Sequence, residues 1–213
     1  MRRLILSLVL VVGLLALADR VAAFAAQRVV AERIQSDQSL AVRPGVTIAG
    51  FPFLTQLFRG HYQRVDVTVR DIRRGSLDIS KVVAHLSDVD VPFSAVVHQH
   101  VKRIDVSRAT AEVDLDYSDV NRLLAGKHLQ ISDGADGKVH LTASASAGGA
   151  GVHVDGDFPL TVQGSTLVIA LPAGQSVEIP LPSLPFGIKL QSARADKSGI
   201  VVRCSTSSFI LRP

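Results

Sequence analysis

Residues 46–72, VTIAGFPFLTQLFRGHYQRVDVTVRDI, predict a strand, an aromatic turn, a short helix and a second strand in succession. The apolar side chains of residues 53–58 recur at helical spacing, which gives a short helix one apolar face. Gly60 is expected to end this helix, because glycine readily adopts the left-handed backbone of a helix C-terminus. Residues 64–70 alternate between apolar and polar, the pattern of a strand with one buried face. The stretch holds four of the chain's ten aromatic residues.

The composition favours one domain with an N-terminal appendage. The chain has 213 residues, of which 47% are hydrophobic and 5% aromatic, and it contains no tryptophan. Its net charge of +4 is dispersed without a basic cluster, so nucleic acid is not an expected partner, although an anionic membrane surface would attract it. Cys204 is the only cysteine, which excludes an intrachain disulfide, and its apolar neighbours predict a buried thiol.

The N-terminus has the features of a secretory leader. Arg2 and Arg3 precede residues 4–18, which carry no charge. As a helix this stretch would span roughly 22 Å, which is shorter than the ~30 Å hydrocarbon core of a bilayer. Residues 16–18, Ala-Leu-Ala, offer a small-x-small cleavage site.

We therefore expect residues 1–18 to be either a cleaved signal peptide or an uncleaved signal anchor. A longer membrane span would have to include Asp19 and Arg20, and charges inside a bilayer are costly. Both alternatives place residues 19–213 outside the cytoplasm.

The remaining sequence predicts an α+β domain. Residues 19–38 form an alanine-rich helix that is apolar on more than one side, which favours neighbours on more than one side; a stalk continuing a membrane anchor is the alternative. Most later segments alternate between apolar and polar residues, which indicates an antiparallel sheet. Breaks in the alternation, as near Ser87 and Asp88, indicate bulges. We expect a strongly curved antiparallel sheet that wraps around the long N-terminal helix.

Two later segments depart from the strand pattern. Residues 117–126 predict a short helix, with Ser118 as its N-cap and Gly126 at its end. Residues 172–185 are rich in proline, so we expect them to form an extended loop or a sheet edge.

The predicted sheet has small inward-facing residues, mostly Val, Ala and Leu. A sheet with one apolar face must cover that face, and the helices available for this are short or made of small residues. A hollow apolar interior suited to acyl chains is one outcome, and a fully packed core is the ordinary one.

Three motifs resemble those of a known family: GFPFLTQLFRG at residues 50–60, YSDVNRLLAG at residues 117–126 and LPSLPFGIKLQSARADKSGIVV at residues 181–202. In this order they resemble the actinobacterial LmeA-type family of phospholipid-binding cell-envelope proteins, from about residue 19 to the C-terminus. The resemblance implies an elongated, tubular lipid-binding fold akin to the bactericidal permeability-increasing (TULIP-like) proteins. It also implies a cell-envelope location, a role in lipomannan maturation and no known catalytic residues.

We therefore expect residues 19–213 to form a single non-catalytic domain that holds the acyl chains of a phospholipid. The expected partners are phospholipid, the outer face of the cytoplasmic membrane and a membrane mannosyltransferase. The alternative is an envelope scaffold that stabilises a membrane glycosyltransferase by protein contact, without a lipid cargo. The residues expected to line or gate the apolar groove are Phe51, Phe53, Leu54, Leu57, Phe58, Phe93, Leu123, Leu124, Leu184 and Phe186.

The sequence contains no pattern that indicates catalysis or metal binding. His98 and His100 share one face of a strand, but two ligands are too few for a structural metal site. Asp114 and Asp116 could pair as acid and base, but they fall on the outward face of a predicted strand. We therefore expect neither an enzyme nor a metal or cofactor site.

Overall fold

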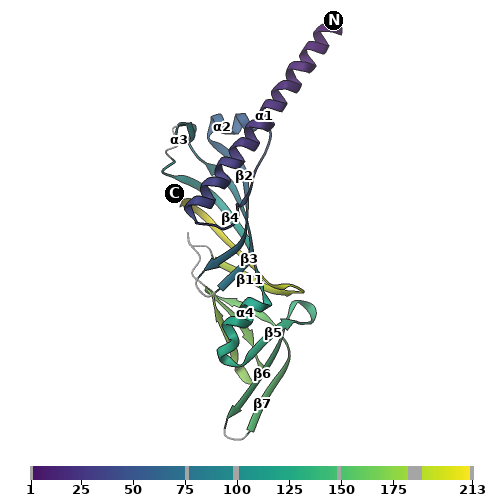
Figure 1. Ribbon diagram of the computed structural model, residues 1–213, viewed down its shortest axis with the longest axis vertical. Coiled ribbons are helices and arrows are strands. Elements are labelled where there is room, and N and C mark those ends of the chain that lie inside the picture. The colour runs from purple at the N-terminus through teal and green to yellow at the C-terminus, as the bar shows by residue number, and fades with distance from the viewer. Residues whose placement is uncertain (1, 75–76, 98–100, 148–149, 182–188, 212–213) are drawn as a thin grey trace. The chain divides into compact units, whose positions relative to one another are not determined.

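The computed structural model describes residues 2–74, 77–97, 101–147, 150–181 and 189–211 (Figure 1). It is an α+β structure with a long N-terminal helix and antiparallel sheets, as the sequence predicted. The chain divides into two compact units. Unit 1 comprises Met1–Thr68, His85–Ala109 and Ser207–Pro213, and unit 2 comprises Val69–Ala84 and Thr110–Thr206.

The helices are α1 (Arg2–Asp37), α2 (Phe53–Arg59), α3 (Phe93–Val97) and α4 (Tyr117–Leu124), with 3-10 turns η1 (Ala125–Lys127), η2 (Ala135–Gly137) and η3 (Pro172–Gly174). The strands are β1 (Gly45–Ala49), β2 (His61–Arg74), β3 (Leu77–Asp90), β4 (Ile104–Asp116), β5 (Leu129–Asp133), β6 (Val139–Ala147), β7 (Ala150–Phe158), β8 (Leu160–Gln163), β9 (Thr166–Ala170), β10 (Ser176–Pro180), β11 (Lys189–Asp196) and β12 (Gly199–Leu211).

The described strands form a six-stranded sheet and two three-stranded sheets. The six-stranded sheet has the order β1-β2-β3-β4-β12-β11, and the smaller sheets have the orders β10-β9-β8 and β5-β6-β7. At one edge, β1 pairs antiparallel with β2 and places Ile48 opposite Val65. The proline-rich residues 172–185 were predicted to be a loop or a sheet edge. Their described part is η3 followed by β10, which is an edge strand.

The prediction that a strongly curved sheet wraps around the N-terminal helix is not met in the described residues. No sheet there is strongly curled, and the buried residues of α1 are Asp19, Ala23 and Ala31. The breaks in alternation are absorbed locally instead, since Asp88 takes a positive φ of 51°. Alanine also has the highest helix propensity, so an alanine-rich helix does not require neighbours on several sides.

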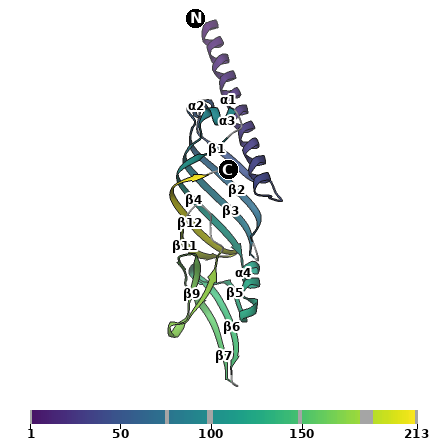
Figure 2. The ribbon, with the colours of Figure 1, turned by 90° about the vertical axis from the view of Figure 1, so that its left-hand side faces the viewer.

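The apolar core of unit 1 joins α1, β1 and α2 to the strands β2, β3 and β4. Its buried residues are Ala23, Ile48, Phe53, Tyr62, Val89, Val91 and Val106. The elements α2 and α3 lie side by side next to α1 in both views (Figures 1 and 2). The N-terminal part of α1 extends past them, and residues 2–15 of that part are all exposed.

The apolar core of unit 2 contains α4, which is fixed by two polar side chains. The Tyr117 hydroxyl donates to the Asp196 carbonyl at 2.9 Å, and burial raises the pKa of Tyr117 to about 12. The Asn121 amide donates to the Ile131 carbonyl at 2.8 Å and accepts from the Ile131 N–H at 2.7 Å. The Asn121 bonds hold α4 against β5, and the Tyr117 bond holds it to the end of β11, while Val120 and Leu124 fill the core beneath it.

The predicted start of this helix at residue 117 is confirmed, but its predicted N-cap and its predicted end are each wrong by two residues. The helix begins at Tyr117, so Ser118 lies inside it, and its N-cap is Asp116. It ends at Leu124, and Gly126 lies within the 3-10 turn η1, after which His128 takes the left-handed backbone. Cap residues such as serine and glycine locate a helix end only approximately, because a neighbouring residue can take the same role.

The turn at Gly60 generates the first prediction. Gly60 has a φ of 69°, and a Cβ there would lie 2.7 Å from the Val91 carbonyl oxygen. We predict that Gly60→Ala lowers the free energy of unfolding by more than the about 1 kcal/mol expected for a left-handed alanine alone. Urea denaturation of the purified chain in detergent would measure this loss.

Two glycines provide matched controls for this substitution. Gly164 has a φ of 61°, and a Cβ there would have no neighbour within 4 Å, so Gly164→Ala should show the backbone cost alone. Gly126 has neither a positive φ nor a neighbour within 4 Å, so Gly126→Ala should be close to neutral. Equal losses for Gly60→Ala and Gly164→Ala would contradict the close approach of Gly60 to Val91.

Candidate functional site

The helix α2 is held at its N-terminus by a carboxylate from α1. The cap residue Pro52 makes no side-chain hydrogen bond, so the first amides of α2 need an acceptor from elsewhere. Asp19 supplies it: the Leu54 N–H donates to Asp19 Oδ1 at 2.8 Å. The side chain of Asp19 is only 4% exposed, and its second oxygen accepts from the Arg20 guanidinium. A buried carboxylate thus ties α1 to α2 across 35 residues of sequence.

Arg20 extends the same junction to the turn before α2. Its guanidinium donates to the Gly50 carbonyl at 3.3 Å, and its Cζ lies 5.0 Å from the centre of the Phe51 ring. This distance is within the range of a cation–π interaction. Phe51 is nevertheless 66% exposed, so Arg20 covers only part of it.

Gln56 fixes the inner face of α2 to the strands. Its amide donates to the Ala49 carbonyl at 3.3 Å, and its Oε1 accepts from the Gln63 N–H at 3.1 Å. Gln56 is buried, and these bonds satisfy its polar atoms. At the C-terminus the Gly60 N–H donates to the carbonyls of α2, so the helix ends where the sequence predicted.

Six of the predicted lipid-binding residues gather on α2, α3 and the turn before α2, and together they are called the α2–α3 cluster. Phe53 is 1% exposed, and its ring centre lies 6.4 Å from that of Tyr62 in the core of unit 1. Phe58 is 67% exposed, and its ring centre lies 5.1 Å from that of the half-buried Phe93. The cluster consists of Phe51, Phe53, Leu54, Leu57, Phe58 and Phe93, of which Leu54 and Leu57 are half-buried against the core.

The other four predicted residues do not join this cluster. Leu124 is buried in the core of unit 2, and Leu123 is half-buried against that core. Leu184 and Phe186 lie outside the described residues.

The two cores differ in how completely the protein covers them. In the described part of the chain, the core of unit 1 has 7 buried residues and 10 partly buried apolar residues packed against it. The core of unit 2 has 17 buried and 14 partly buried residues. Among these described residues, more than half of the unit 1 set is only partly buried, and this part includes Leu54, Leu57, Val65, Leu86, Ile104 and Phe209.

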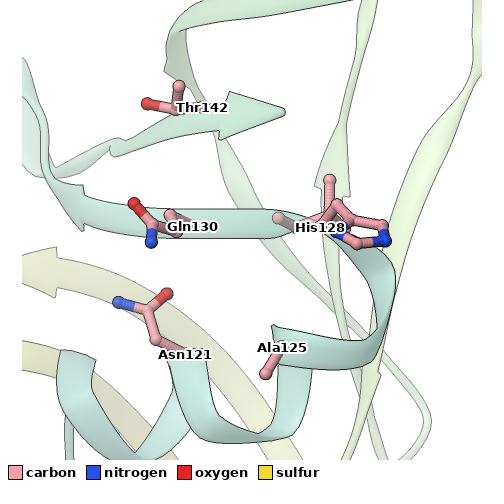
Figure 3. Close-up of a pocket in the computed structure, with 6 residues that line it drawn as sticks. Asn121, Ala125, His128, Gln130 and Thr142 are labelled. Atoms are coloured by element: carbon pink, nitrogen blue, oxygen red, sulfur yellow. The ribbon is translucent and has the colours of Figure 1, made fainter. Parts of the chain in front are cut away.

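A depression of about 460 Å³ lies in unit 2 between α4, η1 and the strands β5 and β6 (Figure 3). Its lining is Asn121, Ala125, His128, Leu129, Gln130 and Thr142. Four of these side chains are polar, and the Asn121 amide is already bonded to the Ile131 backbone. The depression does not have the apolar lining that the sequence predicted for an acyl-chain site.

Many of the described titratable groups outside the Asp19 junction form pairs at the protein surface. His140 Nδ1 lies 2.8 Å from Asp157 Oδ1, and this hydrogen bond raises the pKa of His140. The Ala135 N–H and His140 both bond to Asp157 and lower the pKa of its carboxyl. Cys204 is buried, as predicted, and burial raises the pKa of its thiol to about 11, so the thiol is protonated at neutral pH.

Metal-binding geometry is likewise not found among the residues that the structure describes. No group of three or more His, Cys, Asp or Glu side chains there is placed to hold a metal ion. His98 and His100 lie outside those residues.

A comparison with known protein families identifies the family of this chain. A model of the LmeA-like phospholipid-binding family matches residues 17–205, which is most of the chain. The chain belongs to the LmeA-like phospholipid-binding family. The resemblance read from the sequence motifs is thereby confirmed. No curated protein and no solved structure matches this LmeA-like chain.

The N-terminal helix of this LmeA-like chain is long and apolar enough, by length and composition, to cross a membrane. Its position near the N-terminus is consistent with either a signal sequence or a membrane anchor. The family match begins at residue 17, close to the end of the uncharged residues 4–18. Asp19, the first buried residue among those described, follows directly.

Sequence reasoning missed the polar residues that position the cluster. Asp19 and Arg20 were read only as charges that a membrane span would avoid. Their pairing with Leu54 and Gly50 connects segments 30 or more residues apart, which no local pattern reveals. The one available signal was the absence of a capping side chain at Pro52, directly before an apolar helix.

The Asp19 contact generates the second prediction. Asp19→Leu should lower the melting temperature of the chain, because the α2 amides lose their acceptor and remain buried. Asp19→Asn should lower it less, because the amide oxygen of asparagine still accepts a hydrogen bond. Circular dichroism of the full chain in detergent would measure both changes.

Asp37 at the other end of α1 is a matched control. Its exposed carboxylate pairs only with Arg33, at 3.2 Å, among the contacts described. Exposed pairs of this kind contribute little to stability, so Asp37→Leu should leave the melting temperature nearly unchanged. An Asp19→Leu variant as stable as the unaltered chain would contradict the capping role of Asp19.

Proposed function

We propose that this chain is a non-catalytic phospholipid-binding protein of the cell envelope, which holds acyl chains against an apolar surface of unit 1. The observation that carries the proposal is its membership of the LmeA-like phospholipid-binding family over residues 17–205. The incompletely covered core of unit 1 supports it, because a hydrocarbon chain gains free energy by covering exposed apolar surface.

The α2–α3 cluster is the proposed start of the acyl-chain site. Leu54, Leu57 and Phe93 are half-buried, so they have both a fixed position and surface left to contact a lipid. Phe53 would support them from the core beneath. Each buried CH₂ group contributes ~0.8 kcal/mol, so a few methylenes per chain supply a substantial affinity.

Three of the remaining predicted residues belong to the same proposal. Leu123 in unit 2, and Leu184 and Phe186 beyond the described residues, would add further lipid contacts, whereas Leu124 is enclosed in the core of unit 2. A TULIP-like lipid-binding fold is part of the proposal.

The proposed setting is the outer face of the cytoplasmic membrane. The apolar N-terminal residues 1–18 would serve as a signal peptide or signal anchor, so that residues 19–213 act outside the cytoplasm. There the protein would support lipomannan maturation, with a membrane mannosyltransferase as its partner. Neither nucleic acid nor a cofactor enters this proposal.

Leu57→Asp provides the third prediction and tests the lipid site. A carboxylate at this half-buried position would face the acyl chain, and an unpaired charge against hydrocarbon is costly. We expect the purified Leu57→Asp chain to retain about tenfold less phospholipid than the unaltered chain, measured by native mass spectrometry and lipid extraction.

Leu40→Asp is the matched control, because Leu40 is also half-buried in unit 1 but belongs to neither apolar core. It should leave the bound phospholipid unchanged, and far-ultraviolet circular dichroism should show both variants folded. An unaltered chain that purifies without phospholipid and takes up none from liposomes would overturn the proposal. In that case the scaffold role, with protein contact alone, would be favoured.

A further inference from the structure

We propose that the exposed rings of the α2–α3 cluster, Phe51 and Phe58, form a membrane-docking surface. The partner is the phospholipid bilayer that the apolar segment of α1, residues 4–18, would enter. The rings would rest at the boundary between headgroups and acyl chains, while Arg20 and Arg59 meet the anionic headgroups. This inference goes beyond the lipid cargo of the proposed function, because docking does not require a bound lipid.

The position of the cluster along α1 is the first argument. The uncharged residues 4–18 end one residue before Asp19, whose carboxylate holds the N-terminus of α2. Arg20 lies over the ring of Phe51. If residues 4–18 occupy the hydrocarbon core, Asp19 and Arg20 are at the membrane–water boundary, and the bonds to α2 place Phe51 at the same level.

The exposure of the rings is the second argument. Phe51 and Phe58 are 66% and 67% exposed, although the chain has only eight phenylalanines. Phe58 pairs with Phe93 on the neighbouring helix α3, and Phe51 lies in the turn directly before α2. The helices α2 and α3 lie side by side (Figure 2), so both exposed rings belong to the same end of unit 1. Large apolar side chains exposed at one end of a unit are a mark of an interaction site.

The charges around the rings favour a bilayer as the partner. Arg20 is half exposed and Arg59 in the last turn of α2 is exposed, so both can reach phosphate groups. An apolar surface with arginines at its margin matches the boundary of an anionic membrane, where aromatic rings and long basic side chains both lie favourably. If the adjoining apolar helix segment anchors the chain, it also places this surface next to a bilayer.

The absence of tryptophan from the chain allows a direct test. The full chains carrying Phe51→Trp or Phe58→Trp would be reconstituted in vesicles of phosphatidylcholine and phosphatidylglycerol. Part of the phosphatidylcholine would carry bromine on the upper part of its acyl chains. We expect the bromine to lower the tryptophan emission of both variants about twofold, because indole rings at the interface contact these carbons.

Val42→Trp is the matched control. Val42 is 48% exposed in unit 1 and follows the C-terminal end of α1. The helix places Asp37 about 27 Å beyond Asp19 along its axis, at ~1.5 Å per residue, so Val42→Trp should not be quenched. Quenching at residues 51 and 58 that is no stronger than at residue 42 would overturn the proposal. The same result is expected if the rings contact a partner protein instead of the bilayer, so that outcome also counts against docking.

A second measurement separates docking from lipid cargo. After transfer from vesicles to lipid-free detergent, quenching at residues 51 and 58 should disappear if these rings face the bilayer. Quenching that persists with stoichiometric brominated lipid would assign the rings to the cargo site and overturn docking. Loss of bound phospholipid in the Leu57→Asp chain tests the proposed function separately, because that readout does not depend on contact with vesicles.

Discussion

The structure of unit 1 depends on one buried carboxylate. The helix α2 has only seven residues and begins after a proline, so its first amides have no acceptor of their own. Asp19 accepts the hydrogen bond of Leu54 and is itself held by Arg20. Since the rest of α1 contributes mainly alanines to the core, this contact fixes where along the helix the aromatic residues lie.

The position of the aromatic residues along α1 connects the lipid-binding proposal with the membrane-docking proposal. The same junction holds Phe53 in the core and leaves Phe51 and Phe58 at the surface, close to the end of the apolar N-terminal segment. A surface that contacts a bilayer and adjoins an incompletely covered apolar core would let an acyl chain pass from one to the other without crossing water. Membrane docking and lipid binding would then be successive uses of the same end of unit 1.

Local patterns in the sequence predicted the elements better than their arrangement. The spacing of residues 53–58 and the glycine at 60 located α2 correctly, because both signals act within one helix. The sequence also identified six residues that gather in the α2–α3 cluster. It grouped Leu124 with them, although Leu124 lies in the core of unit 2, because hydrophobicity indicates burial without indicating in which core. The strongly curved sheet is not found in the described residues, where a break in alternation coincides with a positive φ at Asp88.

Hydrogen–deuterium exchange at the Leu54 amide tests the capping role of Asp19 most directly. The measurement compares the full chain with its Asp19→Leu variant in the same detergent. An amide in the first turn of a short helix exchanges rapidly unless a side chain accepts its hydrogen bond. The structure predicts slow exchange at Leu54 in the unaltered chain and fast exchange in Asp19→Leu, with amides of unit 2 unchanged. Fast exchange at Leu54 in both proteins would contradict the account.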